Sequence, residues 1–160
     1  MGEMSRIVRT ITAIAFPFAM IYGLYVIAHG HLTPGGGFQG GAVVASALAM
    51  ILVAYGSKWT VGKIKEKNLS VLESLGAIGF IGIALFGLIF GSEIFFNNFL
   101  ANTDSLFGVI PVTGSTFANI NTAGVLPLMN FAVGLKVIAG LFVIVLVMAY
   151  AVTTFKEGKK

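Results

Sequence analysis

The sequence of 160 residues has no cysteine and few charged side chains. Without cysteine there can be no disulfide, thiolate zinc site, iron–sulfur cluster or cysteine nucleophile, so any redox centre would have to belong to another chain. Only 10% of the residues are charged and 57% are hydrophobic, whereas a soluble domain carries about a quarter charged residues. This balance indicates that lipid is the main solvent of the folded chain.

Long apolar runs dominate the chain. Four stretches without a charged residue lie at 10–28, 38–56, 74–92 and 137–155. Each approaches the length of about 20 residues that a helix needs to cross a bilayer. With their flanks they predict spans at about 7–28, 38–56, 71–97 and 129–155 and an outer cap at about 98–128, in a single membrane domain over 1–160. We therefore expect an all-α, multi-pass integral protein of the cell membrane.

The first apolar run resembles a signal peptide, because Arg6 and Arg9 precede it. It is too long for the apolar region of a signal peptide, and no small-residue cleavage site follows it. We expect it to be retained as the first span.

Apart from Lys136, lysine and arginine occur only in alternate connections. They occur before the first run, in the link between the second and third runs, and in the tail. These residues are Arg6 and Arg9, then Lys58, Lys63, Lys65 and Lys67, and then Lys156, Lys159 and Lys160. The connections at 29–37 and 98–128 have none. By the positive-inside rule, both termini are predicted to be cytoplasmic. Because these charges flank apolar runs, the net charge of +4 gives no indication of nucleic-acid binding.

The stretch HGHLTPGGGFQGG, residues 29–41, is the most unusual part of the sequence. Residues 35–40 match the dinucleotide-binding pattern G-x-G-x-x-G, but that pattern has meaning only after a strand, and here an apolar helix is expected before it. The stretch is therefore placed in an outer loop before the second span. Thr33 and Pro34 predict the start of that helix, with Thr33 as its cap and Pro34 in its first turn. The glycines allow positive φ angles and close backbone contact.

Small residues recur along the second and third spans. They stand at every fourth position of one helix, and again near the end of the next: Gly37, Gly41, Ala45 and Ala49, then Gly87 and Gly91. Such faces let membrane helices pack backbone to backbone. A chain with four spans has little protein of its own to cover a glycine loop at membrane depth. We therefore expect a neighbouring subunit to cover this surface.

The run from Gly30 to Gly41 resembles the signature G-H-x-x-P-G-G-G-F-x-G-G of the B subunit of Mrp-type multisubunit cation/proton antiporters. Homologous subunits occur in membrane-bound hydrogenases and related respiratory complexes. Gln39, and an opening of the last helix that lacks aspartate, are closer to the hydrogenase-like branch. The resemblance covers the whole chain loosely and residues 29–56 tightly.

The resemblance implies a non-catalytic subunit, without a cofactor, of a complex that exchanges Na⁺ or another monovalent cation for H⁺. The parent complex is either an Mrp-type antiporter or a hydrogenase-like complex, and the implied partners are its other membrane subunits. The signature residues are expected to shape a subunit contact beside the ion route. They are Gly30, His31, Pro34, Gly35, Gly36, Gly37, Phe38, Gly40 and Gly41.

Lys136 is a candidate for the ion route, because a lysine inside a membrane helix is costly unless it pairs, meets water or extends to the interface. It lies about 10 Å down the last helix, and Glu93 of the third span could sit at a similar depth. The alternative is a structural ion pair or a lysine that snorkels outward. Glu73, beside the basic link, is expected to be a solvated carboxylate.

His31 is a second candidate, because histidine titrates near neutral pH and could relay protons. The alternative is that His29 and His31 hydrogen-bond free backbone groups in the glycine loop. Two histidines at positions i and i+2 without a nearby carboxylate make a poor metal site, so no metal is expected.

The sequence does not favour two other classes of function. A self-contained, homo-oligomeric transporter or channel would need acidic residues facing a central pathway, and the spans offer only Glu93 and Lys136 well inside. A membrane enzyme would need a serine–histidine–acid, H-E-x-x-H or paired-aspartate arrangement, and the spans contain none. The sequence therefore favours a subunit of a larger ion-transporting complex.

Overall fold

The computed structural model describes residues 4–90 and 124–157. Regular structure in these ranges is helical, in α1 (Arg6–Ala28), α2 (Gly36–Tyr55), α3 (Ser57–Lys63), α4 (Glu66–Phe90) and α6 (Leu126–Glu157). The four long helices α1, α2, α4 and α6 are long and apolar enough to cross a membrane. The predicted all-α membrane fold with four spans is confirmed.

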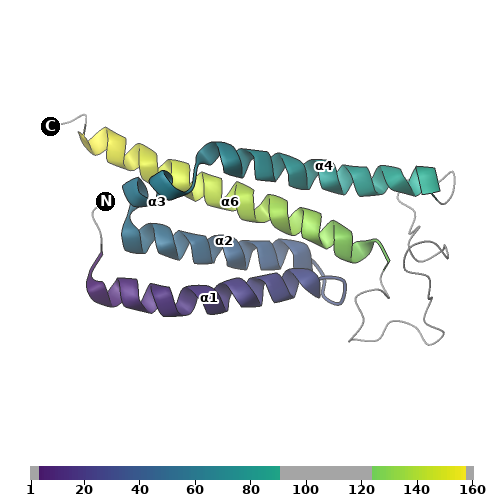
Figure 1. Ribbon diagram of the computed structural model, residues 1–160, viewed down its shortest axis with the longest axis horizontal. Helices are drawn as coiled ribbons and strands as arrows, with labels where there is room; N and C mark the ends of the chain where they lie inside the picture. Colours follow the sequence, from purple (N-terminus) through teal and green to yellow (C-terminus); the bar gives the residue numbers. More distant parts are fainter. Residues whose placement is uncertain (1–3, 91–123, 158–160) are drawn as a thin grey trace.

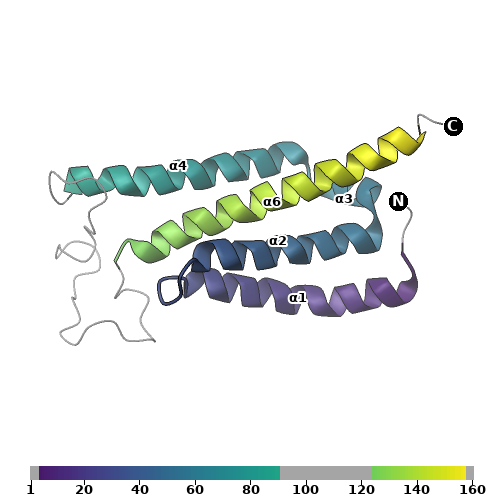
Figure 2. The ribbon, with the colours of Figure 1, turned by 180° about the vertical axis from the view of Figure 1, so that it is seen from behind.

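The long helices stand side by side in the order α1, α2, α6, α4 (Figures 1 and 2). The chain returns to the middle of this row with α6, which packs against α2 on one side and α4 on the other. Thus α1 and α4 are the two edges of an open row. Both edges present large apolar side chains: Ile7, Phe18 and Ile21 on α1, and Ile78, Ile81 and Ile89 on α4.

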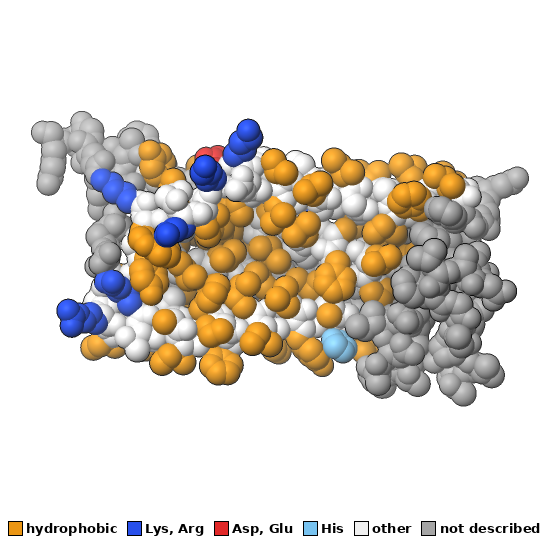
Figure 3. All heavy atoms as spheres, viewed as in Figure 1, with side chains coloured by type: hydrophobic (Ala, Val, Ile, Leu, Met, Phe, Trp, Pro, Cys, Tyr) orange, Lys and Arg blue, Asp and Glu red, His pale blue; other side chains and the backbone are white. Residues whose placement is uncertain are grey.

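Basic side chains gather at one end of the row, where α1 begins and α6 ends, while apolar side chains cover the middle (Figure 3). At this end the Arg9 guanidinium lies 5.3 Å from the centre of the Tyr55 ring, and Tyr55 stacks on Trp59 with ring centres 4.8 Å apart. Aromatic and basic residues of this kind are typical of the membrane–water interface. Which side of the membrane this end faces stays a prediction.

Helix ends differ from the span limits expected from hydropathy. The short helix α3 forms within the basic link, after Gly56 at φ 85°. The next helix, α4, begins at Glu66 and not near residue 71, with its acidic residue favourably placed in the first turn. The last, α6, begins at Leu126 with Pro127 in its first turn. Hydropathy indicates the part of a helix in hydrocarbon, whereas caps and polar residues extend the helix beyond it. Residues 91–123, including most of the expected cap, lie outside the described residues.

The buried core follows α6. Phe142 and Leu146 of α6 pack with Leu52 of α2 and Leu69 of α4 in the half of the row near the basic end. Nearer the opposite end, Met129 of α6 packs with Ala84 of α4. The position of α6 is therefore set by contacts along most of its length, and this fixes the side chains at its start against the glycine turn.

Candidate functional site

The turn between α1 and α2 reverses the chain at Gly35. This glycine has φ 77° and ψ 17°, the left-handed conformation, and it is the N-cap of α2. The predicted cap at Thr33 with Pro34 in the first helical turn is wrong. Both residues are exposed and precede the helix, and the Gly36 N–H donates to the Thr33 carbonyl over 3.3 Å. The reason is that the reversal needs a left-handed residue, which glycine supplies without strain, and α2 can begin only after it.

The two sides of the turn touch through their backbones. A Cβ added to Gly36 would collide with the Gly30 Cα, and one added to Gly30 would lie 2.9 Å from Asn130 Nδ2. On the next residue of α2, a Cβ at Gly37 would lie 2.8 Å from the Asn130 carbonyl oxygen. The start of α6, at Asn130, thus packs tightly against the glycine turn. A side chain at any of these positions would push the three segments apart.

The chain itself covers the small-residue face of α2 at Gly37, Gly41 and Ala45, whereas Ala49 is half-buried and lines an open groove. A Cβ on Gly41 would touch Val137 and the Gly134 carbonyl oxygen of α6. A Cβ on Gly40 would touch Ile27 and the Gly23 carbonyl oxygen of α1. The expectation that another subunit covers these glycines is therefore wrong. Close packing was predicted correctly, but the neighbours are α1 and α6, which reach α2 because the chain returns to the middle of the row.

Other residues of the expected contact surface remain accessible. Pro34, Gly35 and Phe38 are exposed, and the Phe38 side chain retains 57% of its accessible surface. Of the expected packing residues, Ala45 is buried, and Gly87 is buried on α4. Gly91 lies outside the described residues.

An open groove of about 410 Å³ runs between α1 and α2. Its lining is apolar apart from two hydroxyl side chains, and consists of Val8, Thr12, Ser46, Ala49, Met50 and Val53. The Ser46 hydroxyl donates to the Ala42 carbonyl of its own helix over 2.8 Å. The groove therefore offers little polarity to an ion.

Three rings stand in line at the end of α1. Tyr25 stacks on His29 with ring centres 4.3 Å apart, and His29 faces His31 at 6.5 Å. His29 Nδ1 lies 3.2 Å from the Tyr25 carbonyl oxygen, which belongs to α1 and also accepts the His29 backbone N–H. It is not a free group of the glycine loop, so the expected hydrogen bond is not the one found at His29. For His31 the expectation is wrong as well. Both of its ring nitrogens are buried and have no hydrogen-bond partner within the described part of the chain.

Lys136 is exposed on α6. Its backbone lies against α4, since a Cβ at Gly76 would be 2.8 Å from the Lys136 nitrogen and 2.9 Å from the Lys136 Cβ. From Gly76, α4 continues away from the basic end of the row to Phe90, about 21 Å further along the helix axis. Glu93 lies outside the described residues, and its pairing with Lys136 stays a prediction.

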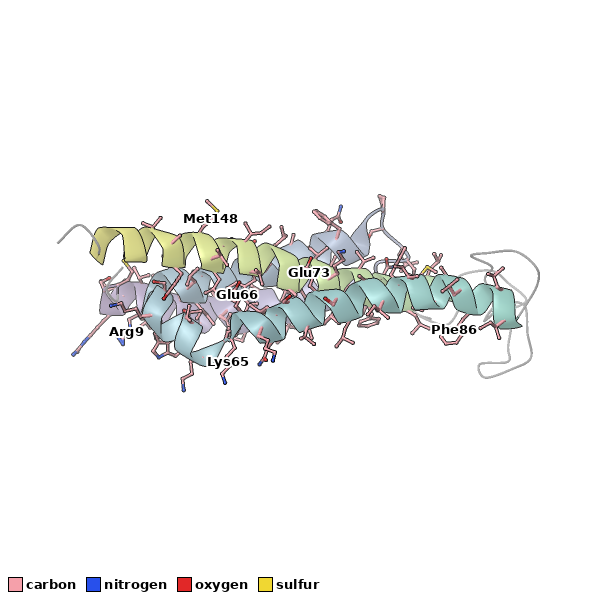
Figure 4. The ribbon with its side chains drawn as sticks, turned by 90° about the horizontal axis from the view of Figure 1, so that it is seen from above. Arg9, Lys65, Glu66, Glu73, Phe86 and Met148 are labelled. Carbon is pink, nitrogen blue, oxygen red and sulfur yellow. The ribbon has the colours of Figure 1, made fainter. Side chains whose placement is uncertain are left out.

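Glu73 is the residue whose importance the sequence analysis missed. It was expected to be solvated, but it is half-buried, and its Oε1 lies 3.5 Å from where a Cβ of Gly140 would stand. Figure 4 shows it where α4 runs beside α6, whereas Lys65 points away from the helices. Helical spacing was the available signal, because Glu73 stands one turn before Gly76 on the packed face of α4. No group of three histidine or acidic side chains that could hold a metal ion occurs among the described residues.

Comparison with known proteins places the fold in a family. A family model described as a domain related to the MnhB subunit of Na⁺/H⁺ antiporter matches residues 7–155. The chain is 38% identical over 146 residues to the uncharacterized protein MJ1307 of Methanocaldococcus jannaschii, which covers 88% of this chain and 50% of that protein. The chain thus spans only half the length of this relative.

Two bacterial relatives carry functional names. One is the B subunit of a Na(+)/H(+) antiporter of Bacillus subtilis, which is 30% identical over 116 residues, covering 69% of this chain and 72% of the relative. The other is the putative antiporter subunit mnhB2 of Staphylococcus aureus, which is 26% identical over 137 residues, covering 86% and 92%. The glycine signature predicted this relationship, and the chain belongs to the family of proteins related to the MnhB subunit of Na⁺/H⁺ antiporters.

Proposed function

We propose that this chain is a non-catalytic membrane subunit of the cation/proton antiporter module of a multisubunit complex, where it scaffolds or lines a path for Na⁺ and H⁺. The observation that carries the proposal is the family match over residues 7–155, which covers every helix of the row. The parent complex is either an Mrp-type antiporter or a membrane-bound hydrogenase-like respiratory complex.

The shape of the row supports a role within a larger assembly. An ion path needs polar groups enclosed by protein or water, because charged groups in hydrocarbon are costly. The four long helices form an open row with α1 and α4 as its edges (Figure 2). Other membrane subunits would close such a path against one face of the row.

Within this assembly, Lys136, Glu93 and His31 are the candidates for lining or coupling to the path. The exposed end of the glycine turn, with Pro34 and Phe38, is the part of the signature that remains available to a neighbouring subunit. We assign these residues no chemical step of their own. Their role is to set the shape and charge of the contact beside the path.

The direct experiment is to tag the chain in its native host, solubilise the membrane gently and analyse the intact particle by mass spectrometry. The proposal expects a hetero-oligomer containing other antiporter subunits. Iron, nickel or flavin in the particle would assign the hydrogenase-like parent, and their absence with exchange activity would assign the antiporter. A homo-oligomer of this chain that alone exchanges Na⁺ for H⁺ in liposomes would overturn the proposal.

A second experiment tests the exposed part of the signature. Pro34→Ala and Phe38→Ala are expected to lower the amount of other subunits that co-purify with the tagged chain, while the level of the chain itself stays unchanged. Phe18→Ala is the matched control, because that ring is also exposed, at 71%, but lies far from the turn on α1. Normal co-purification with both turn variants would remove this contact from the proposal.

A further inference from the structure

The cores of the four membrane helices hold two charged side chains. One is Glu73, which is the lone charged residue of positions 68–90, and the other is Lys136, the lone charged residue of positions 126–155. Residues 10–28 of α1 and all of α2 contain none. Both charges therefore lie on the one pair of helices, α4 and α6, that forms an edge of the row.

These two residues also share one face and nearly one depth. Gly76 of α4 packs against the backbone of Lys136 on α6. One turn away, the Glu73 carboxylate of α4 lies over Gly140 of α6. Positions 73 and 76 are neighbours on α4, and positions 136 and 140 are neighbours on α6. The Glu73 carboxylate and the Lys136 backbone thus lie about one helical turn apart, which is about 5.4 Å along the helix axis.

Glycine makes this arrangement possible. The Glu73 carboxylate lies over Gly140, with Oε1, Cδ and Oε2 at 3.5, 3.6 and 3.9 Å from where a Cβ would stand. A methyl group at position 140 would be in ordinary van der Waals contact with this carboxylate. Because Gly76 has no side chain, the backbone of α6 can lie close to α4 at Lys136. Gly76 therefore lets α4 and α6 approach closely beside the only two charges of the described spans.

The two side chains make no ion pair with each other within the described part of the chain. In a helix, long side chains point back toward the amino terminus. Because α4 and α6 run in opposite directions, this preference turns Glu73 toward the basic end of the row and Lys136 toward the other end. A change of rotamer brings them together, since each is long enough to bridge much of one helical turn. The structure holds the arrangement with the charges apart, and the reach of the two side chains allows a second arrangement in which they pair.

We propose that Glu73 and Lys136 form a two-state charge couple in which the Glu73 carboxylate binds and releases a proton. In the paired arrangement the Lys136 ammonium compensates the ionised carboxylate. When a proton from the water-accessible side bonds to a carboxylate oxygen, the neutral carboxyl no longer needs the ammonium, which turns back to the exposed position seen here. The proton leaves a hydronium ion, whose O–H bond breaks as the O–H bond of the carboxyl forms, and no electrons are transferred. This inference rests on the proposed function, and it names Glu73 as a proton site of the ion path.

The other charged groups of α3 and α4 stand nearer the basic end of the row than this couple. Glu66, Lys65 and Lys67 stand at the start of α4 and are exposed, about two turns or more from Glu73 along the helix. Lys63 ends α3 and is also exposed. The face that carries Lys136 is itself open, and a neighbouring subunit or a water-filled cavity is needed there because an ammonium in lipid is costly.

Exchange should be measured in vesicles containing the assembled complex, with the variants Glu73→Gln, Lys136→Met and the double variant, and with assembly followed on native gels. Each single variant leaves one uncompensated charge, so we expect exchange to fall about tenfold or more. The double variant has no charge to compensate, and we expect it to assemble at the normal level while exchange stays low. Glu66→Gln is the matched control, since its carboxyl is exposed on the same helix, and it should leave exchange unchanged.

The double variant separates a proton site from a structural pair. Exchange that returns together with assembly would mean that the charges only stabilise one another, and would overturn the inference. Normal exchange in the single variants would overturn it as well.

A chemical probe tests the site without depending on exchange. A membrane-permeable carbodiimide reacts with protonated carboxyl groups in apolar surroundings, and mass spectrometry locates the modified residue. We expect modification at Glu73 that increases as the pH is lowered and that changes in rate when Lys136 is replaced by methionine. If Glu73 is labelled in a chain that proves to have no antiporter partners, the proposed function fails and the proton site stands. Absence of labelling at Glu73 in an assembled, active complex would overturn the proton site alone.

Discussion

Gly36 lies against the backbone of Gly30 so closely that a Cβ on Gly36 would collide with the Gly30 Cα and lie 3.0 Å from its carbonyl carbon and oxygen. Each of these atoms belongs to the main chain and cannot move by a change of rotamer. The glycines of the signature are therefore needed first for packing. Whatever the turn contributes to ion exchange depends on this contact between the end of α1 and the start of α2.

Replacing Gly36 by alanine should destabilise the fold, because the two sides of the turn must separate to admit the methyl group. Overpacking of this kind costs about 1–3 kcal/mol. The measurement is the free energy of unfolding in detergent micelles. Gly82→Ala is the matched control in a membrane helix, since a Cβ there meets nothing within 4 Å, and it should be neutral or stabilising because alanine is the better helix former. Equal stability of the two variants would contradict the close contact.

Phe142 anchors α6 in the middle of the row. Its side chain is fully buried, with 0% exposure, among Leu52, Leu69 and Leu146. Phe142→Ala should lower the free energy of unfolding by about 3 kcal/mol, because the cavity it leaves can collapse only in part. The same substitution at Phe18, which is 71% exposed on α1, should change it by less than about 0.5 kcal/mol. A similar loss at both positions would mean that α6 is not held by this core.

Much of the fold could be predicted from the sequence, because hydropathy and charge act over whole segments. The four apolar runs identified the four long helices, and the string of glycines predicted a left-handed residue, found at Gly35. The helix ends were less predictable. At Glu66 and Leu126 the helices extend beyond the apolar runs, since polar residues and proline are well accommodated in a first turn.

The candidate site could be predicted only in part, because its contacts join residues far apart in the chain. Small residues on α2 indicate that some helix packs there, but not that the neighbours are Gly23 of α1 and Asn130 of α6. The surroundings of His31 likewise depend on tertiary packing, which leaves its buried nitrogens without a partner in the described residues. Glu73 was missed because it stands near a basic link, although helical spacing turns it toward α6.

His31→Phe should leave the fold as stable as before, or stabilise it. Both ring nitrogens are buried without a partner in the residues that the structure describes. Burying a polar group without a hydrogen bond costs about 1–3 kcal/mol by mutational measurements, and phenylalanine removes that cost while keeping a ring of similar shape. The melting temperature of the purified protein is the measurement. A fall in stability would show that the imidazole makes a hydrogen bond that holds the turn.

If such a variant is stable, exchange activity then tests the proton-relay hypothesis for His31 without the complication of misfolding. Loss of exchange in a stable, assembled complex would support a relay, because phenylalanine cannot carry a proton. Unchanged exchange would limit the residue to packing.

Because the chain has no cysteine of its own, single cysteines can be introduced to test the orientation of the row in the membrane. Thr33 and Lys65 are both exposed and lie at opposite ends of the row, in the α1–α2 turn and just before α4. Because lysine and arginine favour the cytoplasmic side, Thr33→Cys should react with a membrane-impermeant maleimide in intact cells, and Lys65→Cys only after the cells are opened. The α1–α2 turn would then face outward, and the end with the basic residues inward. The reverse labelling pattern would contradict the predicted topology and would place the basic end, nearest Glu73, on the outer side of the membrane.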